Sequence, residues 1–114
     1  MMRAVEIRTY ELKPGSRDQF DRMMRGHSLP MLLRWNVDVV GCGPSPHDDD
    51  SYVLVRSYRD LDERRASQDA FYGSEEWRAG PREAILAMIG QYASVVLMLD
   101  EDAIDALRRA LGPR

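Results

Sequence analysis

Hydrophobic and polar side chains alternate with a period of two over residues 4–12, and three further segments, 36–42, 51–58 and 92–99, are rich in residues that favour β-strands. Such alternation, and such enrichment, here in valine and tyrosine, are typical of β-strands. The first segment ends at Lys13-Pro14-Gly15, a sequence that favours a turn. The pattern therefore predicts four strands.

Between and after these strands, apolar residues recur at helical spacing. One helical region begins after Ser16 and is interrupted at Ser28 and Pro30. A second begins at the capping box formed by Asp60 and Glu63 and runs to about residue 72, with shorter pieces near 74–77 and 82–89. A last helix over 101–111 begins with acidic residues and ends with basic ones, which suits the helix dipole.

The order of elements is β-α-β-β-α-β followed by a C-terminal helix. This order predicts an α+β, ferredoxin-like fold with a four-stranded antiparallel sheet. We expect one domain over residues 1–99 and a helix over 100–114 that packs either on this domain or on a partner subunit.

Both faces of the predicted sheet carry apolar side chains, although helices should cover only one of them. An uncovered apolar face favours association, so we expect a homodimer with sheets packed face to face. In this interpretation one set of side chains faces the helices (Val5, Ile7 and Thr9) and another lies between the two sheets (Glu6, Arg8, Tyr10, Arg56 and Tyr58). Buried arginines need partners, and Glu6 and Asp38 are the candidates.

Composition and charge narrow the class of protein and its partners. The chain has 114 residues, one cysteine and a formal net charge of −3, which fits a single domain and argues against a nucleic-acid partner or a polybasic membrane anchor. A single cysteine, Cys42, allows no intramolecular disulfide and favours a reducing compartment. No leader or membrane-spanning apolar run is recognised, so a cytoplasmic protein is expected.

The segment IRTYELKPGS at residues 7–16 resembles the opening of NIPSNAP-family domains, a strand of the type ELRTY followed by a Lys-Pro-Gly turn. The segments LPMLLRW, VVG, SYRDLDERRAS and SEEWRA agree with the family in order and spacing, and the resemblance covers residues 4–99. It implies a dimeric α+β barrel, an architecture shared with cofactor-independent monooxygenases, haem-degrading oxygenases and lactone isomerases. Where the family often has a histidine or an aromatic residue, in the third strand, this chain has Leu54 and Arg56.

Several residues are candidates for chemistry. His27 is either a general base beside a pocket or an exposed histidine at a helix end. Arg8 and Tyr10 either bind and protonate an anionic ligand or belong to a polar seam that fixes the register of a dimer. The expected ligand-binding residues, which are either cleft-lining or structural, are Arg56, Trp35, Tyr52, Tyr58, Tyr72 and Trp77.

The loop His47-Asp48-Asp49-Asp50 carries metal-ligand side chains, but consecutive ligands on a flexible loop rarely complete a coordination sphere. We therefore interpret it as a hydrated hairpin tip and expect neither a metal nor a cofactor. No nucleotide-binding or zinc-protease motif is present. The expected function is to bind or convert a small organic molecule in a bacterial metabolic or biosynthetic pathway, as an oxygenase, isomerase or cyclase would. The alternative is a non-catalytic binding or scaffold protein.

Overall fold

Four antiparallel strands form one sheet in the computed structural model, which describes residues 1–113. The strands are β1 (Met2–Leu12), β2 (Asp38–Pro44), β3 (Ser51–Tyr58) and β4 (Ile89–Asp100). Their order in the sheet is β2-β3-β1-β4, so the first strand lies in the centre and β2 and β4 form the edges. This topology confirms the ferredoxin-like α+β fold that the order of elements predicts.

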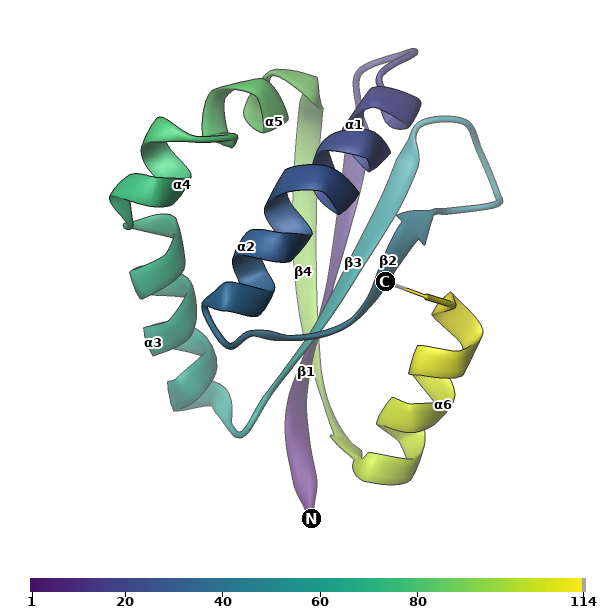
Figure 1. Cartoon of the computed structure of the whole chain (residues 1–114). Coiled ribbons are helices and arrows are strands. Elements are labelled where there is room, and N and C mark those ends of the chain that lie inside the picture. Colours follow the sequence, from purple (N-terminus) through teal and green to yellow (C-terminus); the bar gives the residue numbers. More distant parts are fainter. Residues whose placement is uncertain (114) are drawn as a thin grey trace.

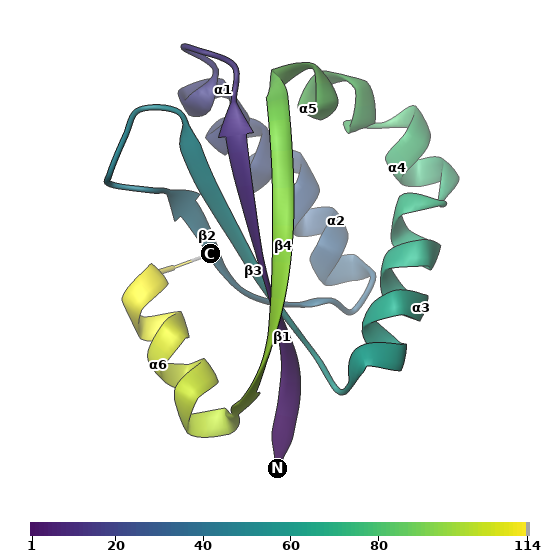
Figure 2. The same cartoon turned by 180° about the vertical axis from the view of Figure 1, so that it is seen from behind.

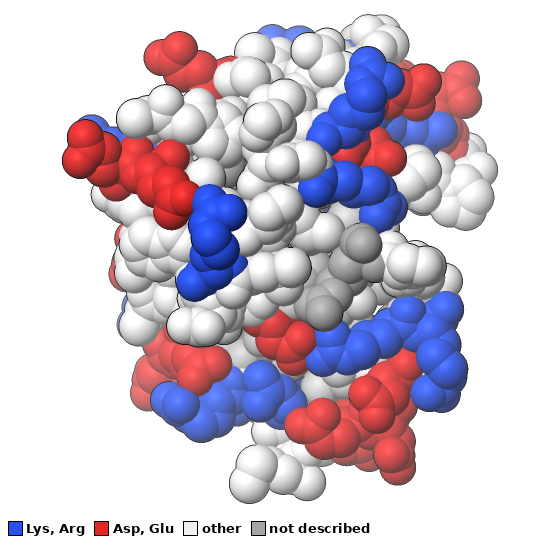
Figure 3. Space-filling model, in the orientation of Figure 1, with Lys and Arg blue, Asp and Glu red and all other residues white. Residues whose placement is uncertain are grey.

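All the helices except the last lie on one face of this sheet (Figure 1). They are α1 (Arg17–Met23), the π-helical turn η1 (Met24–Ser28), α2 (Leu29–Arg34), α3 (Leu61–Tyr72), α4 (Glu75–Ala79) and α5 (Arg82–Met88). The last helix, α6 (Glu101–Leu111), lies on the opposite face. On the side of the molecule that carries α1 and α2, acidic and basic side chains gather in small groups of both signs (Figure 3).

Two helix starts follow directly from the sequence. At the start of α3 the Asp60 carboxylate accepts a hydrogen bond from the Glu63 backbone N–H at 2.8 Å, as the capping box predicts. At the start of α6 the Asp100 carboxylate accepts from the Ala103 N–H at 2.9 Å. Each carboxylate satisfies a backbone donor that the helix leaves unpaired.

The break expected at Ser28 and Pro30 does not separate two helices. The chain instead passes from α1 into α2 through η1, whose wider turn ends at Ser28. Pro30 has no N–H, and its ring would clash with the carbonyl group four residues earlier in a regular α-helix. A π-helical turn just before the proline accommodates this and keeps the helical region continuous.

The assignment of the two sheet faces from the sequence is wrong. Glu6, Arg8 and Tyr10 face the helices, and Val5 and Ile7 lie on the opposite face. Strict alternation fixes which side chains share a face, but it does not decide which face the helices cover. The polar side chains can lie under the helices because α3 supplies partners for them.

The face opposite the helices is only partly covered. Ile104 of α6 is fully buried against Val5, Val40 and Val55. Figure 2 shows that α6 lies beside the β2 end of this face, while β4 runs past it with no helix in front. The C-terminal helix therefore packs on its own domain, and Asp38 pairs with Arg108 of α6 at 2.8 Å rather than with Arg8 or Arg56.

Candidate functional site

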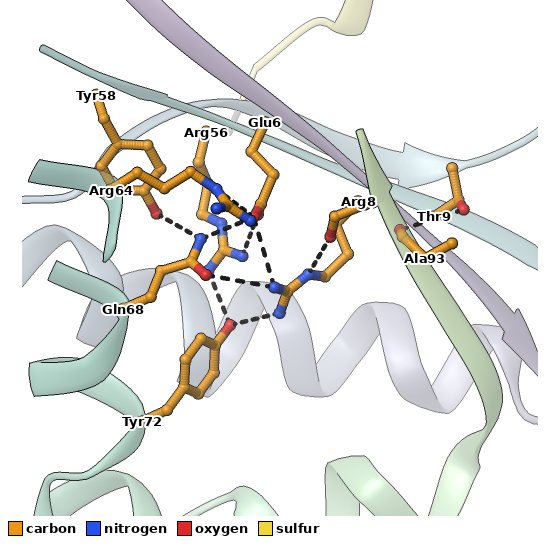
Figure 4. Close-up of polar contacts among 10 residues, drawn as sticks. Glu6, Arg8, Thr9, Arg56, Tyr58, Arg64, Gln68, Tyr72 and Ala93 are labelled. Atoms are coloured by element: carbon orange, nitrogen blue, oxygen red, sulfur yellow. Dashed lines mark hydrogen bonds and ion pairs between the residues drawn. The ribbon is translucent and has the colours of Figure 1, made fainter. Parts of the chain in front are cut away.

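A buried carboxylate organises the polar side chains between the sheet and α3 (Figure 4). Glu6 of β1 is 0% exposed, and its Oε1 accepts a hydrogen bond from Arg56 Nη2 at 2.5 Å. Its Oε2 accepts from Arg64 Nε and Nη2 at 2.9 and 2.6 Å and from Gln68 Nε2 at 2.9 Å. Arg8 Nη2 approaches the same oxygen only to 3.5 Å. We call these five residues the Glu6 network.

The charges of the Glu6 network do not balance. Burial by itself would raise the pKa of Glu6, but the charge of Arg56, the hydrogen bond from Gln68 and the charge of Arg8 outweigh it and lower the pKa from 4.5 to about 2. Glu6 is therefore ionised at neutral pH. One carboxylate then stands against three guanidinium groups, those of Arg8, Arg56 and Arg64, and within residues 1–113 no other carboxylate pairs with them. The network carries a surplus of two positive charges.

Arg8 is the guanidinium of this network that lines the cleft described below, and it is farther from the Glu6 carboxylate than Arg56 or Arg64 is. Its Nε donates to Ser94 Oγ at 3.0 Å, its Nη1 to the Tyr72 hydroxyl at 3.2 Å and its Nη2 to Gln68 Oε1 at 3.5 Å. The guanidinium also lies over the rings of Tyr72 and Tyr92, at 5.6 and 5.1 Å from their centroids. A guanidinium has five N–H donors, so two take no part in these three hydrogen bonds.

The Tyr72 hydroxyl also has a hydrogen left to donate. Its oxygen accepts from Arg8 Nη1 at 3.2 Å and from Arg56 Nη1 at 2.8 Å. Both partners are obligate donors, so the phenolic hydrogen must be directed elsewhere. No acceptor for it occurs in the described part of the chain.

A cleft of about 590 Å³ opens beside Arg8 and Tyr72. It lies between the sheet and the helices α3, α4 and α5, and its lining combines three kinds of residue: aromatic (Tyr10, Tyr72, Trp77, Tyr92), aliphatic (Ile85, Leu86, Ile89) and polar (Arg8, Gln68, Asp69, Arg82), together with Gly73. We call this the helix-side cleft. Arg82 and Asp69 add one charge of each sign, so the positive surplus persists at the cleft.

A second hollow, of about 1310 Å³, lies at the other end of the sheet near the β2–β3 hairpin and the end of α6. Tyr52 lies at its edge and donates to Asp21 at 2.5 Å, and burial raises the pKa of the Cys42 thiol. A buried, protonated thiol is a poor nucleophile. This hollow is larger than the helix-side cleft, and the arginine in its lining, Arg25, pairs with the Asp21 carboxylate at 3.0 Å.

The structure brings only some of the predicted site residues together. Arg8, Tyr10, Tyr72 and Trp77 line the helix-side cleft. Burial, together with the nearby Tyr72, raises the pKa of Tyr10 despite Arg56 and Arg8, so its phenol stays protonated at neutral pH.

Two predicted residues lie behind the cleft rather than in its lining. Arg56 is 0% exposed, and its Nε has no hydrogen-bond partner among the described residues. Burial also raises the pKa of Tyr58, whose hydroxyl accepts from Gln68 Nε2 at 3.2 Å. Both side chains support the Glu6 network and cannot touch a ligand in the cleft. They hold one sheet against α3 and do not form a seam between two sheets.

Three predicted residues lie apart from the cleft. His27 is exposed in η1 and belongs to the lining of neither hollow. Trp35 donates to Glu76 at 2.8 Å at the surface, and Tyr52 lies at the far end of the sheet. The π-helical turn changes the direction of the His27 side chain. It adds a residue to the turn, so the side chains rotate away from the apolar face expected of a regular α-helix.

Sequence analysis missed Arg64 and Gln68 in the Glu6 network, and Arg82 and Tyr92 in the cleft. One signal for the first two was available. Arg64, Gln68 and Tyr72 are spaced by four residues, which places them on one face of α3. A polar face on a helix that covers a sheet predicts polar partners beneath it.

Neither a metal site nor a membrane span is found in residues 1–113. No three of their His, Cys, Asp and Glu side chains are arranged to hold a metal ion, and none of their helices is long and apolar enough to cross a membrane. In the β2–β3 hairpin Asp48 accepts hydrogen bonds from the N–H groups of Asp50 and Ser51 at 2.9 and 2.8 Å, which closes the turn.

The fold places the protein among ferredoxin-like α+β proteins with helices on one face of an antiparallel sheet. The sequence profile of the NIPSNAP family matches residues 5–102. The protein therefore belongs to the NIPSNAP family. A comparison with curated protein sequences finds no match.

Solved structures agree with this assignment. An uncharacterized NIPSNAP domain protein from Burkholderia xenovorans is 24% identical, with a TM-score of 0.74 over 86% of this chain and 95% of the other. A NIPSNAP family protein from Agrobacterium tumefaciens is 15% identical, with a TM-score of 0.78 over 87% of each chain. A candidate antibiotic biosynthesis monooxygenase from Nitrosomonas europaea is 17% identical, with a TM-score of 0.61 over 82% of this chain and 95% of the other. At these identities the likeness shows the shared fold.

Proposed function

We propose that this protein binds a small organic anion in the helix-side cleft. The observation that carries the proposal is the surplus of two positive charges in the Glu6 network, one of which, on Arg8, is exposed to the cleft. A partly buried charge without a counter-ion is costly. An anion at Arg8 removes that cost and occupies the donors that the protein leaves unused.

Binding fits these groups better than proton transfer does. Glu6 is ionised and already accepts four hydrogen bonds, so it is a poor base, and Tyr10 is held in its protonated form. Conversion of the ligand is the second candidate, and one observation favours it. Arg8 and Tyr72 are joined by a hydrogen bond of 3.2 Å and both line the cleft, and neighbouring donors of this kind can stabilise charge that develops on an oxygen atom.

Native mass spectrometry of protein purified from its own host tests the proposal. We expect a retained organic acid in the wild type, its loss in Arg8→Gln, and its retention in Arg78→Gln, which removes an exposed arginine of α4 outside the cleft. A wild-type protein with no retained organic acid, or equal retention in the Arg8 variant, would contradict the proposal. A retained compound that changes on incubation with the protein would favour conversion.

We also propose that the protein is a homodimer that pairs through the sheet face opposite the helices. Val95 and Leu97 of β4 are 58% and 46% exposed on this face, next to the apolar side chains that α6 covers. The same face of a second copy is the simplest cover for these side chains.

Light scattering at micromolar concentration measures the oligomeric state. We expect a dimer in the wild type and a monomer in Leu97→Arg. The matched control is Leu61→Arg, because Leu61 is 55% exposed but lies on α3 in the helix layer. A monomeric wild type, or a dimeric Leu97→Arg variant, would refute this mode of pairing.

A further inference from the structure

We infer that the ligand of the helix-side cleft is a flat aromatic monocarboxylate, with its carboxylate at Arg8 and Tyr72 and its ring system against the aromatic and aliphatic walls. This inference rests on the proposed anion-binding function and specifies its chemical class. Three properties of the cleft support it: the number and place of unused donors, the composition of the walls, and the sign of the charge at each part of the lining.

The unused donors match a carboxylate. Two N–H groups of Arg8 take no part in its three hydrogen bonds, and the Tyr72 hydroxyl has one hydrogen to donate. The two groups are joined by a hydrogen bond of 3.2 Å. The remaining donors of Arg8 and Tyr72 therefore belong to groups that lie side by side. A carboxylate has two oxygens and about four lone-pair sites, and it accepts the paired N–H groups of a guanidinium in a bidentate fork.

The position of Arg8 is fixed before a ligand arrives. Its Nε is held by Ser94 of β4, and its flat face lies over the rings of Tyr72 and Tyr92. Glu6 contributes only a loose contact of 3.5 Å, because its oxygens are occupied by Arg56, Arg64 and Gln68 at shorter distances. Arg8 is thus oriented by the protein, but its charge is not cancelled by it.

The walls of the cleft match a flat apolar body. Trp77 and Tyr72 pack edge to face with their ring centroids 5.3 Å apart, and both line the cleft. Leu86 and Tyr92 also line it and are 41% and 59% exposed in the chain by itself. A ring between such walls buries exposed apolar surface and makes stacking contacts. A volume of about 590 Å³ lies within the range of small-molecule sites and admits two fused rings.

The charges in the lining favour a ligand with one anionic group. Asp69 lines the same cleft and is exposed. A second negative charge on the ligand, as in a phosphate dianion, would meet this carboxylate or the apolar wall, and either encounter is unfavourable. Arg82, also exposed in the lining, carries one positive charge, which can balance either Asp69 or a second negative charge on the ligand but not both.

Isothermal titration calorimetry at neutral pH with four defined probes tests the inference. The probes are 2-naphthoate, its methyl ester, acetate and inorganic phosphate. We expect 2-naphthoate to bind and the ester to bind at least about tenfold more weakly, because the ester removes the charge-assisted hydrogen bonds. Acetate and phosphate should bind more weakly still, since neither fills the apolar walls.

Two variants locate the binding site. Tyr72→Phe keeps the ring and removes the hydroxyl, and we expect about a fivefold or larger loss of 2-naphthoate affinity. Arg8→Gln should lose binding almost completely, and Arg78→Gln should bind as the wild type does. If Arg8→Gln fails to fold, the comparison of acid and ester on the wild type still decides whether the carboxylate is recognised.

The outcomes separate the class of ligand from the anion site itself. Phosphate or acetate binding without 2-naphthoate binding would overturn the aromatic class and leave the anion site in place. Equal affinity for the acid and the ester, or an unchanged affinity in Tyr72→Phe, would overturn the role of the carboxylate. A wild type that binds none of the anions, and that retains no organic acid when purified from its host, would refute both proposals.

Discussion

The substitution Glu6→Gln removes the carboxylate that holds three guanidinium groups together while keeping the size of the side chain. The difference between a pKa of 4.5 in the unfolded chain and about 2 in the folded protein, at about 1.36 kcal/mol for each pKa unit, corresponds to about 3 kcal/mol of stability at neutral pH. The loss on breaking a buried ion pair, about 3–5 kcal/mol, has the same size. We therefore expect Glu6→Gln to unfold with a free energy about 3 kcal/mol lower than the wild type at pH 7.

The effect should depend on pH in a defined direction. The folded-state pKa of Glu6 is depressed, so the unfolded chain binds more protons between pH 4.5 and about 2, and the stabilisation is lost as the pH falls through this window. About 2 kcal/mol of the contribution should disappear between pH 7 and pH 3. A glutamine has no proton to bind, so the gap between wild type and variant should shrink to about a third of its size, about 1 kcal/mol.

Urea unfolding followed by circular dichroism at pH 7 and pH 3 measures both quantities. Glu11→Gln, an exposed position on the same strand, serves as the control and should change stability little at either pH. Asp48, Asp60 and Glu76 also have lowered pKa values, because each accepts hydrogen bonds, but they are common to all three proteins and cancel in the difference. Equal stability of Glu6→Gln and wild type at pH 7, or a gap that does not change with pH, would refute the reasoning.

Two further substitutions test the packing of α6. Ile104→Ala should lower the free energy of unfolding by about 2–5 kcal/mol, because Ile104 is fully buried between α6 and the sheet; a loss below about 1 kcal/mol in urea unfolding would contradict that packing. Gly41→Ala would place a Cβ 2.6 Å from Leu111 Cβ, so we expect a loss of about 1–3 kcal/mol. In that case Leu111→Gly, which removes the Cβ as well as the rest of the side chain, should cost less in the Gly41→Ala background than it does in the wild type. Additive losses would show that the two residues do not collide.

The local pattern of the chain was enough to predict its elements. A run of strong β-forming residues defined β3 at residues 51–58, and the capping residue Asp60 placed the start of α3, because both signals act over a few residues. The order of the elements then led to the ferredoxin-like topology, which short, non-crossing connections nearly impose. The stripe of Ile104, Leu107 and Leu111 likewise predicted an amphipathic last helix.

The candidate site could be predicted only in part. Glu6 was named as a candidate partner for buried arginines, and it pairs with Arg56. Arg8 and Tyr10 were named in one set and Tyr72 and Trp77 in another, and the structure places all four in the lining of the cleft. Of the two interpretations left open for His27, the structure agrees with the exposed histidine at a helix end, because His27 lies exposed in η1 and outside the lining of the cleft. Arg82 and Tyr92 carry no signal in the sequence, since an arginine at a helix start and a tyrosine at a strand start look ordinary.

The sequence by itself determined the strands, the helices, their order and the membership of Glu6, Arg8 and Tyr10 in one face of β1. Only the tertiary structure decided that this face lies under α3 and that Asp38 pairs with α6. The physical reason is that the two faces of a strand are equivalent in its own sequence. Which face is covered depends on contacts such as Glu6 with Arg64, made between residues 58 positions apart. That long-range pairing leaves two positive charges unbalanced beside an open cleft.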